Sequence, residues 1–161
     1  MTDPRRIRVL FLCTGNSCRS QMGEAILRHL GGDRFEVFSA GSHPAGFVHP
    51  LAIDALAKLG VPITDGGSKS WNEFAETSMD VVITVCDAAA GEPCPVWVGA
   101  PLTAHWSLPD PVFQLGTDEE RLAFTLRVAE RLRAKIQGLV DLDWSSKPEQ
   151  LRRRLEFLGE I

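Results

Sequence analysis

The sequence predicts an α/β protein with a three-layer α/β/α arrangement, in which helices cover a central parallel sheet of about four strands. Two observations lead to this expectation. Three short apolar runs, residues 7–12, 35–40 and 80–85, are rich in β-branched residues and Phe, which is typical of strands buried on both faces. Helical patterns separate these runs, and such alternation is expected when each helix crosses over a parallel sheet.

The first two helices follow from apolar spacing and from signals at their ends. The first carries an apolar face and stops at the pair Gly31-Gly32; that face consists of Met22, Ala25, Ile26 and Leu30. The second covers residues 51–59, with Pro50 before it and Gly60 after it. The weakest strand signal lies around residues 103–106, where we expect the fourth strand.

Two capping boxes predict the remaining helices. Thr117 with Glu120 begins a long helix, whose apolar stripe is Leu122, Leu126, Ala129, Leu132, Ile136 and Leu139. Ser146 with Glu149 begins a shorter one that carries Leu151, Leu155 and Leu158. Since no repeat or linker interrupts the pattern, we expect residues 1–161 to form a single domain, with a core at about 7–140 and a helical extension at 146–159.

Composition limits the classes of function. The 161 residues are 44% hydrophobic and 24% charged, as in ordinary globular proteins, and a net charge of −4 gives no electrostatic reason to bind nucleic acid. The apolar stretch before Cys13 is too short for an export signal or a membrane span, so we expect a cytoplasmic protein. In that compartment, four cysteines are more typical of thiols, ligands or catalytic groups than of structural disulfides.

The candidate site lies where the predicted strands end. Cys13 follows the first strand, the turn at residues 39–44 follows the second, and Cys86 follows the third. Because ligands of open α/β sheets bind outside the carboxyl ends of the strands, we expect these three features to meet at one edge.

The loop after the first strand has the composition of an anion-binding site. Gly15 and Asn16 tolerate backbone angles that turn successive N–H groups inward, and the following helix N-terminus adds positive potential. Arg19 can donate two parallel hydrogen bonds to a tetrahedral oxyanion. The same groups would stabilise a thiolate at Cys13, and lowering its pKa by about two units would make the thiolate the main form at pH 7.

We therefore expect Cys13 to be a nucleophile facing an oxyanion, rather than a buried cysteine at a strand end. The residues expected to bind that oxyanion are Thr14, Gly15, Asn16, Ser17, Cys18, Arg19 and Ser20.

The pattern Cys-x5-Arg-Ser between a strand and a helix, with Asp110-Pro111 far downstream, resembles the low-molecular-weight protein tyrosine phosphatase superfamily, which includes the thiol-dependent arsenate reductases. The resemblance runs from about residue 7 to residue 139 and implies the fold of that family. It also implies that Cys13 is the nucleophile, that Arg19 binds the oxyanion and that Asp110 donates a proton to the departing oxygen.

The stretch CDAAAGEPC, from Cys86 to Cys94, separates two chemistries within this superfamily. A phosphatase needs one cysteine because water hydrolyses the phosphocysteine, whereas arsenate reduction needs two electrons, which thiols supply by forming a disulfide. In the reductases that this chain resembles, a second cysteine attacks the first, a third attacks the second, and thioredoxin reduces the disulfide that is left. The resemblance implies an arsenate reductase that uses Cys13, Cys86 and Cys94 in that order, releases arsenite, and binds phosphate or sulfate as analogues.

The spacing of the two later cysteines sets a geometric requirement. On one helix they would lie about 12 Å apart along the axis, whereas bridged Cα atoms lie within about 7 Å. Seven residues separate them, one more than in the reductases that the chain resembles, and Gly91 and Pro93 prevent a stable longer helix. We therefore expect this segment to change conformation with its redox state.

Two other functions stay open on the sequence. One is a small protein tyrosine or acid phosphatase that uses Cys13, Arg19 and Asp110, and the other is a non-enzymatic oxyanion-binding sensor. Cys18 is expected to be an early helical residue with a structural role, although it can form a disulfide with Cys13 under oxidation. Structural roles are also expected for three histidines near the site, because their spacing demands neither catalysis nor metal binding: His43, His49 and His105.

No metal or other cofactor is expected. Some members of the family that this chain resembles hold potassium with an Asn, a Glu, a Ser and an Asp. Asn16, Glu24 and Ser39 match the first three, but Ser70 stands at the fourth position, so the resemblance does not by itself imply a bound cation. A zinc site that includes the two later cysteines is disfavoured, because C-x7-C is not a usual ligand spacing.

Overall fold

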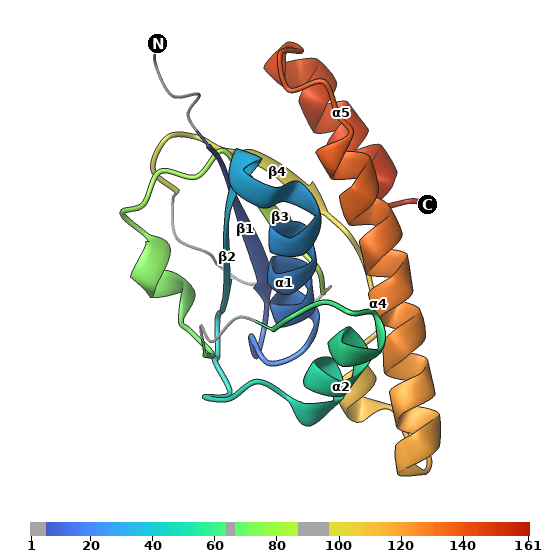
Figure 1. The fold of residues 1–161 in the computed structure, drawn as a ribbon. Coiled ribbons are helices and arrows are strands. Elements are labelled where there is room, and N and C mark those ends of the chain that lie inside the picture. The colour runs from blue at the N-terminus through green and yellow to red at the C-terminus, as the bar shows by residue number, and fades with distance from the viewer. Residues whose placement is uncertain (1–5, 64–66, 87–96) are drawn as a thin grey trace.

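The computed structural model describes residues 6–63, 67–86 and 97–161. They form a parallel sheet in the order β2-β1-β3-β4, which lies at the centre of Figure 1. Its strands are β1 (Ile7–Cys13), β2 (Phe35–Gly41), β3 (Val81–Thr84) and β4 (Leu102–His105). The predicted four-stranded parallel sheet is therefore confirmed, including the fourth strand, the weakest in the sequence.

Helices and short 3-10 helices cover the sheet. The helices are α1 (Arg19–Gly31), α2 (Pro50–Lys58), α4 (Asp118–Val140) and α5 (Pro148–Leu158), and the 3-10 helices are η1 (Gly32–Arg34), η2 (Trp71–Phe74) and η3 (Pro111–Phe113). In Figure 1, α1, α2 and α4 lie on one face of the sheet, η2 lies on the other face, and α5 runs beside β4. In the part of the chain that the structure describes, no helix has the length and apolarity needed to cross a membrane.

Both faces of the sheet are buried, as the continuous apolar runs predict. In β1, Val9 and Phe11 belong to the core beneath the helices, whereas Leu10 and Leu12 belong to a second cluster on the opposite face. Trp71 of η2 is part of that second cluster. A strand with two buried faces needs apolar residues at successive positions, which explains why its sequence does not alternate.

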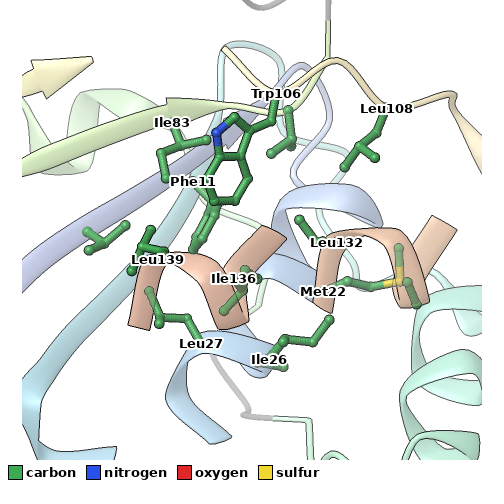
Figure 2. Close-up of a cluster of buried hydrophobic side chains, with 14 of the residues drawn as sticks. Phe11, Met22, Ile26, Leu27, Ile83, Trp106, Leu108, Leu132, Ile136 and Leu139 are labelled. Atoms are coloured by element: carbon green, nitrogen blue, oxygen red, sulfur yellow. The ribbon is translucent and has the colours of Figure 1, made fainter. Parts of the chain in front are cut away.

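The main core lies between the sheet and helices α1 and α4. Figure 2 shows Trp106 on the sheet side of this cluster, next to Phe11, and the centroids of the two rings are 6.2 Å apart. The side chains of Ile26 and Leu132 reach the same cluster from α1 and α4. The indole nitrogen of Trp106 donates a hydrogen bond to the carbonyl oxygen of Leu155 at 2.8 Å, so this buried polar atom is satisfied by α5.

The capping box predicted for α4 is confirmed. The backbone N–H of Glu120 donates to Thr117 Oγ1 at 3.1 Å, and the Glu120 carboxylate accepts from the Thr117 N–H at 3.2 Å. The second predicted box is wrong, because α5 begins at Pro148 with Lys147 as its N-cap and no side-chain cap. Proline is favoured at the first position of a helix because it lacks an N–H and its φ is already helical. Pro148 therefore sets the start of α5, and Ser146 lies too early in the chain to be its N-cap.

The α5 helix is fastened to α4 through a buried lysine. The Lys135 ammonium donates to the carbonyl oxygens of Leu158, Gly159 and Ile161 at 3.2, 3.0 and 2.5 Å. The two helices also approach closely at Gly138, where an added Cβ would lie 2.4 Å from a Leu158 methyl carbon. The end of α5 is thus bound by a charge that complements its C-terminal carbonyl groups.

We expect Leu155→Ala to lower the free energy of unfolding by about 2–5 kcal/mol, because the side chain is fully buried and its loss leaves a cavity. Urea unfolding followed by circular dichroism measures this change. Leu115→Ala is the matched control, since that leucine is 88% exposed, and its effect should stay within about 0.5 kcal/mol. Equal effects of the two substitutions would show that α5 does not contribute to the folded core.

Candidate active site

The predicted site residues meet at the carboxyl edge of the sheet. Cys13 is the last residue of β1, and Arg19 is the first residue of α1 after the connecting loop. Cys86 lies two residues beyond the end of β3, and the N–H of Val85 still donates to the Leu12 carbonyl oxygen at 2.8 Å. Parallel pairing of β1 with β3 therefore brings two cysteines that are distant in the sequence to the same edge.

A cavity of about 410 Å³ opens at this edge. It is lined by Cys13, Thr14, Gly15, Ser17, Cys18, Arg19, Ala45, Phe47, His49, Asp110, Val112 and Phe113. A second cavity of about 350 Å³ lies at the amino edge beside Arg6 and Trp144, and none of the predicted site residues line it. Of these two cavities, the first is therefore the one in which Cys13 can meet a substrate.

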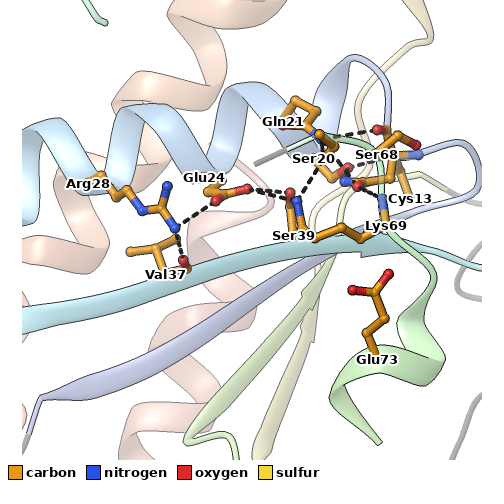
Figure 3. Close-up of polar contacts among 12 residues, drawn as sticks. Cys13, Ser20, Gln21, Glu24, Arg28, Val37, Ser39, Ser68, Lys69 and Glu73 are labelled. Atoms are coloured by element: carbon orange, nitrogen blue, oxygen red, sulfur yellow. Dashed lines mark hydrogen bonds and ion pairs between the residues drawn. The ribbon is translucent and has the colours of Figure 1, made fainter. Parts of the chain in front are cut away.

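The Cys13 thiol contacts one group of the loop that follows it and one group of the first turn of α1. Its sulfur lies 2.9 Å from Ser20 Oγ and accepts the Asn16 N–H at 3.2 Å. Figure 3 shows Cys13 next to Ser20 at the end of the polar network of α1. Burial raises the pKa of the thiol above its ordinary value, while Ser20 and, more weakly, Arg19 lower it. The expected net lowering is therefore not found, because burial outweighs these stabilising groups.

Arg19 is paired with the predicted acid. Its guanidinium Nη2 lies 3.1 Å from Asp110 Oδ2, and Nη1 donates to the Leu108 carbonyl oxygen at 2.9 Å. The other carboxylate oxygen of Asp110 accepts the Val112 N–H at 3.0 Å, which fixes the carboxylate at the start of η3. The positive charge that was expected to favour the Cys13 thiolate is thus partly neutralised by Asp110.

Asn16 adopts the unusual backbone conformation that the loop was expected to need. Its φ is +45°, a left-handed value that asparagine tolerates better than most residues. Its side chain is fully buried, with Nδ2 donating to Ser20 Oγ at 2.8 Å and Oδ1 accepting the Lys69 N–H at 2.7 Å. These contacts hold the loop in a shape that directs the Asn16 N–H at the sulfur.

Gly41, at the end of β2, is a site residue that the sequence analysis missed. A Cβ there would lie 2.4 Å from the Thr14 carbonyl oxygen, 2.8 Å from that of Cys13 and 2.9 Å from the Asn16 nitrogen. Only glycine lets the two backbones come this close. A glycine inside a strand pattern signals such an approach, and it stood in the turn at residues 39–44 that the sequence placed at this edge.

Cys86 lies against the loop that connects β1 to α1, which was predicted to bind an oxyanion and is called the oxyanion loop below. Its sulfur is 3.7 Å from Thr14 Oγ1, the side chain is 2% exposed, and its charge would raise the pKa of Cys13 further. The structure thus brings Cys13 and Cys86 together. Cys94 and the segment expected to change conformation lie outside the described residues.

Cys18 is the N-cap residue of α1 rather than its first helical residue. Burial first, and then the nearby Asp110 carboxylate, raise the pKa of its thiol to about 12, so the thiol is neutral at pH 7. Cys13 and Cys18 both carry free thiols. Cys18 therefore contributes volume and a neutral wall to the cavity.

His49 also lines the cavity, although its spacing gave no reason to assign it a role. Its Nδ1 accepts the Leu51 N–H at 3.1 Å as the side-chain cap of α2, so the other ring nitrogen carries the proton of the neutral ring. Burial, followed by the charge of Arg121, lowers the pKa of His49. The ring is thus a neutral hydrogen-bond donor beside the loop that follows Cys13. The position of His49 directly before Pro50, at the start of a helix, is the sequence signal that could have identified it as a site residue.

The outer walls of the cavity are apolar. They include Phe47, Val112 and Phe113, and the two phenylalanine side chains are 52% and 80% exposed. An oxyanion at the loop needs none of these side chains. The walls can therefore contact an organic group that the anion carries.

Among the residues that the structure describes, no three His, Cys, Asp or Glu side chains converge to hold a metal ion. The ring nitrogen Nδ1 of His105 lies 2.7 Å from Thr84 Oγ1.

Comparisons with known proteins identify close relatives of this chain. The family model of low molecular weight phosphotyrosine protein phosphatases matches residues 8–154. An arsenate reductase of Halalkalibacterium halodurans is 37% identical over 133 residues, which are 83% of this chain and 94% of that protein.

Two solved structures that are similar to this chain are also described as arsenate reductases. A structure described as an arsenate reductase in the phosphate binding state has a TM-score of 0.70 and 31% identity, covering 83% of this chain and 96% of the other. A thioredoxin-dependent arsenate reductase of Corynebacterium glutamicum has a TM-score of 0.56 and 32% identity, covering 82% of this chain and 62% of the other.

We expect Ser20→Ala to slow alkylation of Cys13 by iodoacetamide at pH 7 by about tenfold, because the sulfur loses a hydrogen bond that favours the thiolate. In the unchanged protein the rate should continue to rise above pH 9.0, the ordinary pKa of the thiol, since burial raises that of Cys13. Mass spectrometry of the Cys13 peptide measures both effects. Ser145→Ala, at an exposed serine distant in the sequence, is the control; a faster reaction in Ser20→Ala would contradict the assignment.

Proposed function

This chain belongs to the low molecular weight phosphotyrosine protein phosphatase family, and from that premise we propose that it reduces arsenate to arsenite. The observation that carries the proposal is the position of Cys86 against the loop that holds Cys13, at 3.7 Å from Thr14 Oγ1. A phosphatase needs no second thiol there, whereas a reductase does. Relatives that cover most of this chain are named arsenate reductases, which supports the same choice.

The reaction begins with arsenate in the oxyanion loop. The Cys13 thiolate attacks arsenic, a bond forms between sulfur and arsenic, and one arsenate hydroxyl group takes a proton from Asp110 and leaves as water, with its bond to arsenic broken. The backbone N–H groups of the loop and the Arg19 guanidinium hold the remaining oxygens. Arg19 must therefore turn part of its hydrogen bonding from Asp110 to the anion.

Electron transfer follows through disulfide exchange. The Cys86 thiolate attacks the Cys13 sulfur, the sulfur–arsenic bond breaks, and its electron pair stays on arsenic, which is reduced from As(V) to As(III) and leaves as arsenite. Cys94 then attacks Cys86, which frees Cys13 and leaves a Cys86–Cys94 disulfide. A dithiol must reduce that disulfide to complete the cycle, and thioredoxin is the reductant we propose, supported by the thioredoxin-dependent relative.

Transfer of one proton would prepare both the nucleophile, Cys13, and the acid, Asp110. Asp110 must be protonated to donate, and a neutral Asp110 no longer neutralises Arg19, whose charge then favours the Cys13 thiolate. Transfer of a proton from Cys13 to Asp110 therefore creates both reactive forms without a change in total charge. Such thiol chemistry requires a reducing compartment, and for that reason we propose the cytoplasm as its location.

A second candidate function, hydrolysis of aryl phosphate esters, is favoured by the apolar walls. Phe47 and Phe113 stand where the organic group of an ester would extend from the oxyanion loop. Cys13, Arg19 and Asp110 would perform the same first step on phosphorus, and water would then hydrolyse the phosphocysteine. This activity needs neither Cys86 nor Cys94.

We expect arsenate to convert the reduced protein to a form with a Cys86–Cys94 disulfide, and Cys94→Ser to stop at a Cys13–Cys86 disulfide. A denaturing quench with an alkylating agent, followed by mass spectrometry of the peptides, maps these bonds. Cys13→Ser should form neither bond in response to arsenate, and Cys18 should be alkylated in every sample. Recovery of both Cys86 and Cys94 fully alkylated after arsenite has been released would exclude the proposed relay.

We expect the protein to hydrolyse p-nitrophenyl phosphate, with Phe113→Ala raising KM by about three- to tenfold and leaving kcat nearly unchanged, because the ring contacts the ester and not the reacting atoms. Release of p-nitrophenol measures both constants. Leu115→Ala is the control, since this neighbouring side chain is exposed but does not line the cavity. No hydrolysis by the unchanged protein would exclude the second candidate function.

A further inference from the structure

Glu24 is a buried carboxylate that takes no part in the proposed chemistry. It lies on α1, is 2% exposed and does not line the cavity. Figure 3 shows its contacts: Oε1 accepts the Ser39 hydroxyl at 2.5 Å, and Oε2 pairs with Arg28 at 2.8 Å. A carboxylate this deeply buried is stable as an anion only when cations and hydrogen-bond donors surround it.

Lys69 brings a second cation to Glu24 from a segment far away in the sequence. Its ammonium lies 4.0 Å from Glu24 Oε1 and donates to the Gly67 carbonyl oxygen at 2.7 Å. The side chain is only 17% exposed. In Figure 3 it extends toward Glu24 and Ser39.

The backbone of the same residue holds the oxyanion loop. The Lys69 N–H donates to Asn16 Oδ1 at 2.7 Å, and the Lys69 carbonyl oxygen accepts the Gly41 N–H at 2.9 Å. Next to it, Ser68 Oγ donates to the Gly15 carbonyl oxygen at 3.1 Å. Lys69 therefore connects the buried carboxylate, the end of β2 and the residue whose N–H binds the Cys13 sulfur.

The potassium site of some family members does not fit these contacts. Asn16 Oδ1 already accepts N–H groups from Lys69 and from Gln21, the latter at 3.2 Å. Glu24 already has Arg28 and Lys69 beside it, so a further cation would meet repulsion as well as attraction.

We propose that the Lys69 ammonium is a built-in cation that positions the oxyanion loop, so that the protein needs no bound monovalent cation for this purpose. The ammonium balances the charge of Glu24 and keeps residues 67–70 against the loop. Lys69 is thus a positioning residue, which acts on Cys13 through Asn16. The inference rests on the oxyanion-binding part of the proposed function, but not on arsenate reduction.

The test is the protection of Cys13 against iodoacetamide by inorganic phosphate, in buffer with choline as the only added monovalent cation. We expect Lys69→Met to raise the phosphate concentration for half-protection by about tenfold, because Asn16 and its N–H lose their fixed position. Potassium or ammonium chloride, at equal ionic strength, should restore most of the protection, because either ion can occupy the position of the lost ammonium. Lys58→Met, at an exposed lysine of α2, is the control and should resemble the unchanged protein.

Three results would overturn the inference. One is unchanged protection in Lys69→Met, and another is a loss that neither potassium nor ammonium restores. The third needs no variant and therefore applies even if Lys69→Met does not fold: protection of the unchanged protein that improves when potassium replaces choline. Failure of phosphate to protect the unchanged protein would instead disprove oxyanion binding, and with it the proposed function.

Discussion

The left-handed backbone of Asn16 is the constraint on which the site depends. At a φ of +45° the residue directs its N–H at the Cys13 sulfur, 3.2 Å away, while its side chain reaches Ser20 and Lys69. An asparagine in this conformation is stable only when the surrounding structure holds it. Here that support comes from β2, whose last residue, Gly41, lies directly against the loop backbone. It also comes from the buried pair of Glu24 and Lys69.

The second governing interaction is the ion pair of Arg19 with Asp110, at 3.1 Å. It keeps Arg19 and Asp110 together in the wall of the cavity, and it partly neutralises the positive charge near Cys13, whose pKa burial raises. Any change at Asp110 therefore alters the positive charge that Arg19 presents to Cys13. In the reaction we propose, an anion that draws Arg19 toward the loop would favour the Cys13 thiolate and free Asp110 to act as an acid, so that substrate binding would itself prepare the reaction.

Local signals predicted most of the fold. The strands buried on both faces, the glycine stop after α1 and the capping box of α4 depend on neighbouring residues, and each is found where the sequence indicates. The cap proposed at Ser146 failed because two local signals competed, and Pro148 set the start of α5 one residue later. The loop after β1 could be singled out for the same reason as the strands, since its residues are contiguous in the sequence.

The sequence by itself determined which residue types are available: a cysteine at a strand end, an arginine that opens a helix, a distant aspartate and three further cysteines. Only the tertiary structure decided which of them meet. Parallel pairing of β1 with β3 brings Cys86 to the loop. The end of β2 adds Gly41, whose N–H donates to the Lys69 carbonyl oxygen and so brings the segment before η2 to the same place. The state of the Cys13 thiol was likewise beyond the sequence, because burial and the position of an ion pair are properties of the packed chain, not of its neighbouring residues.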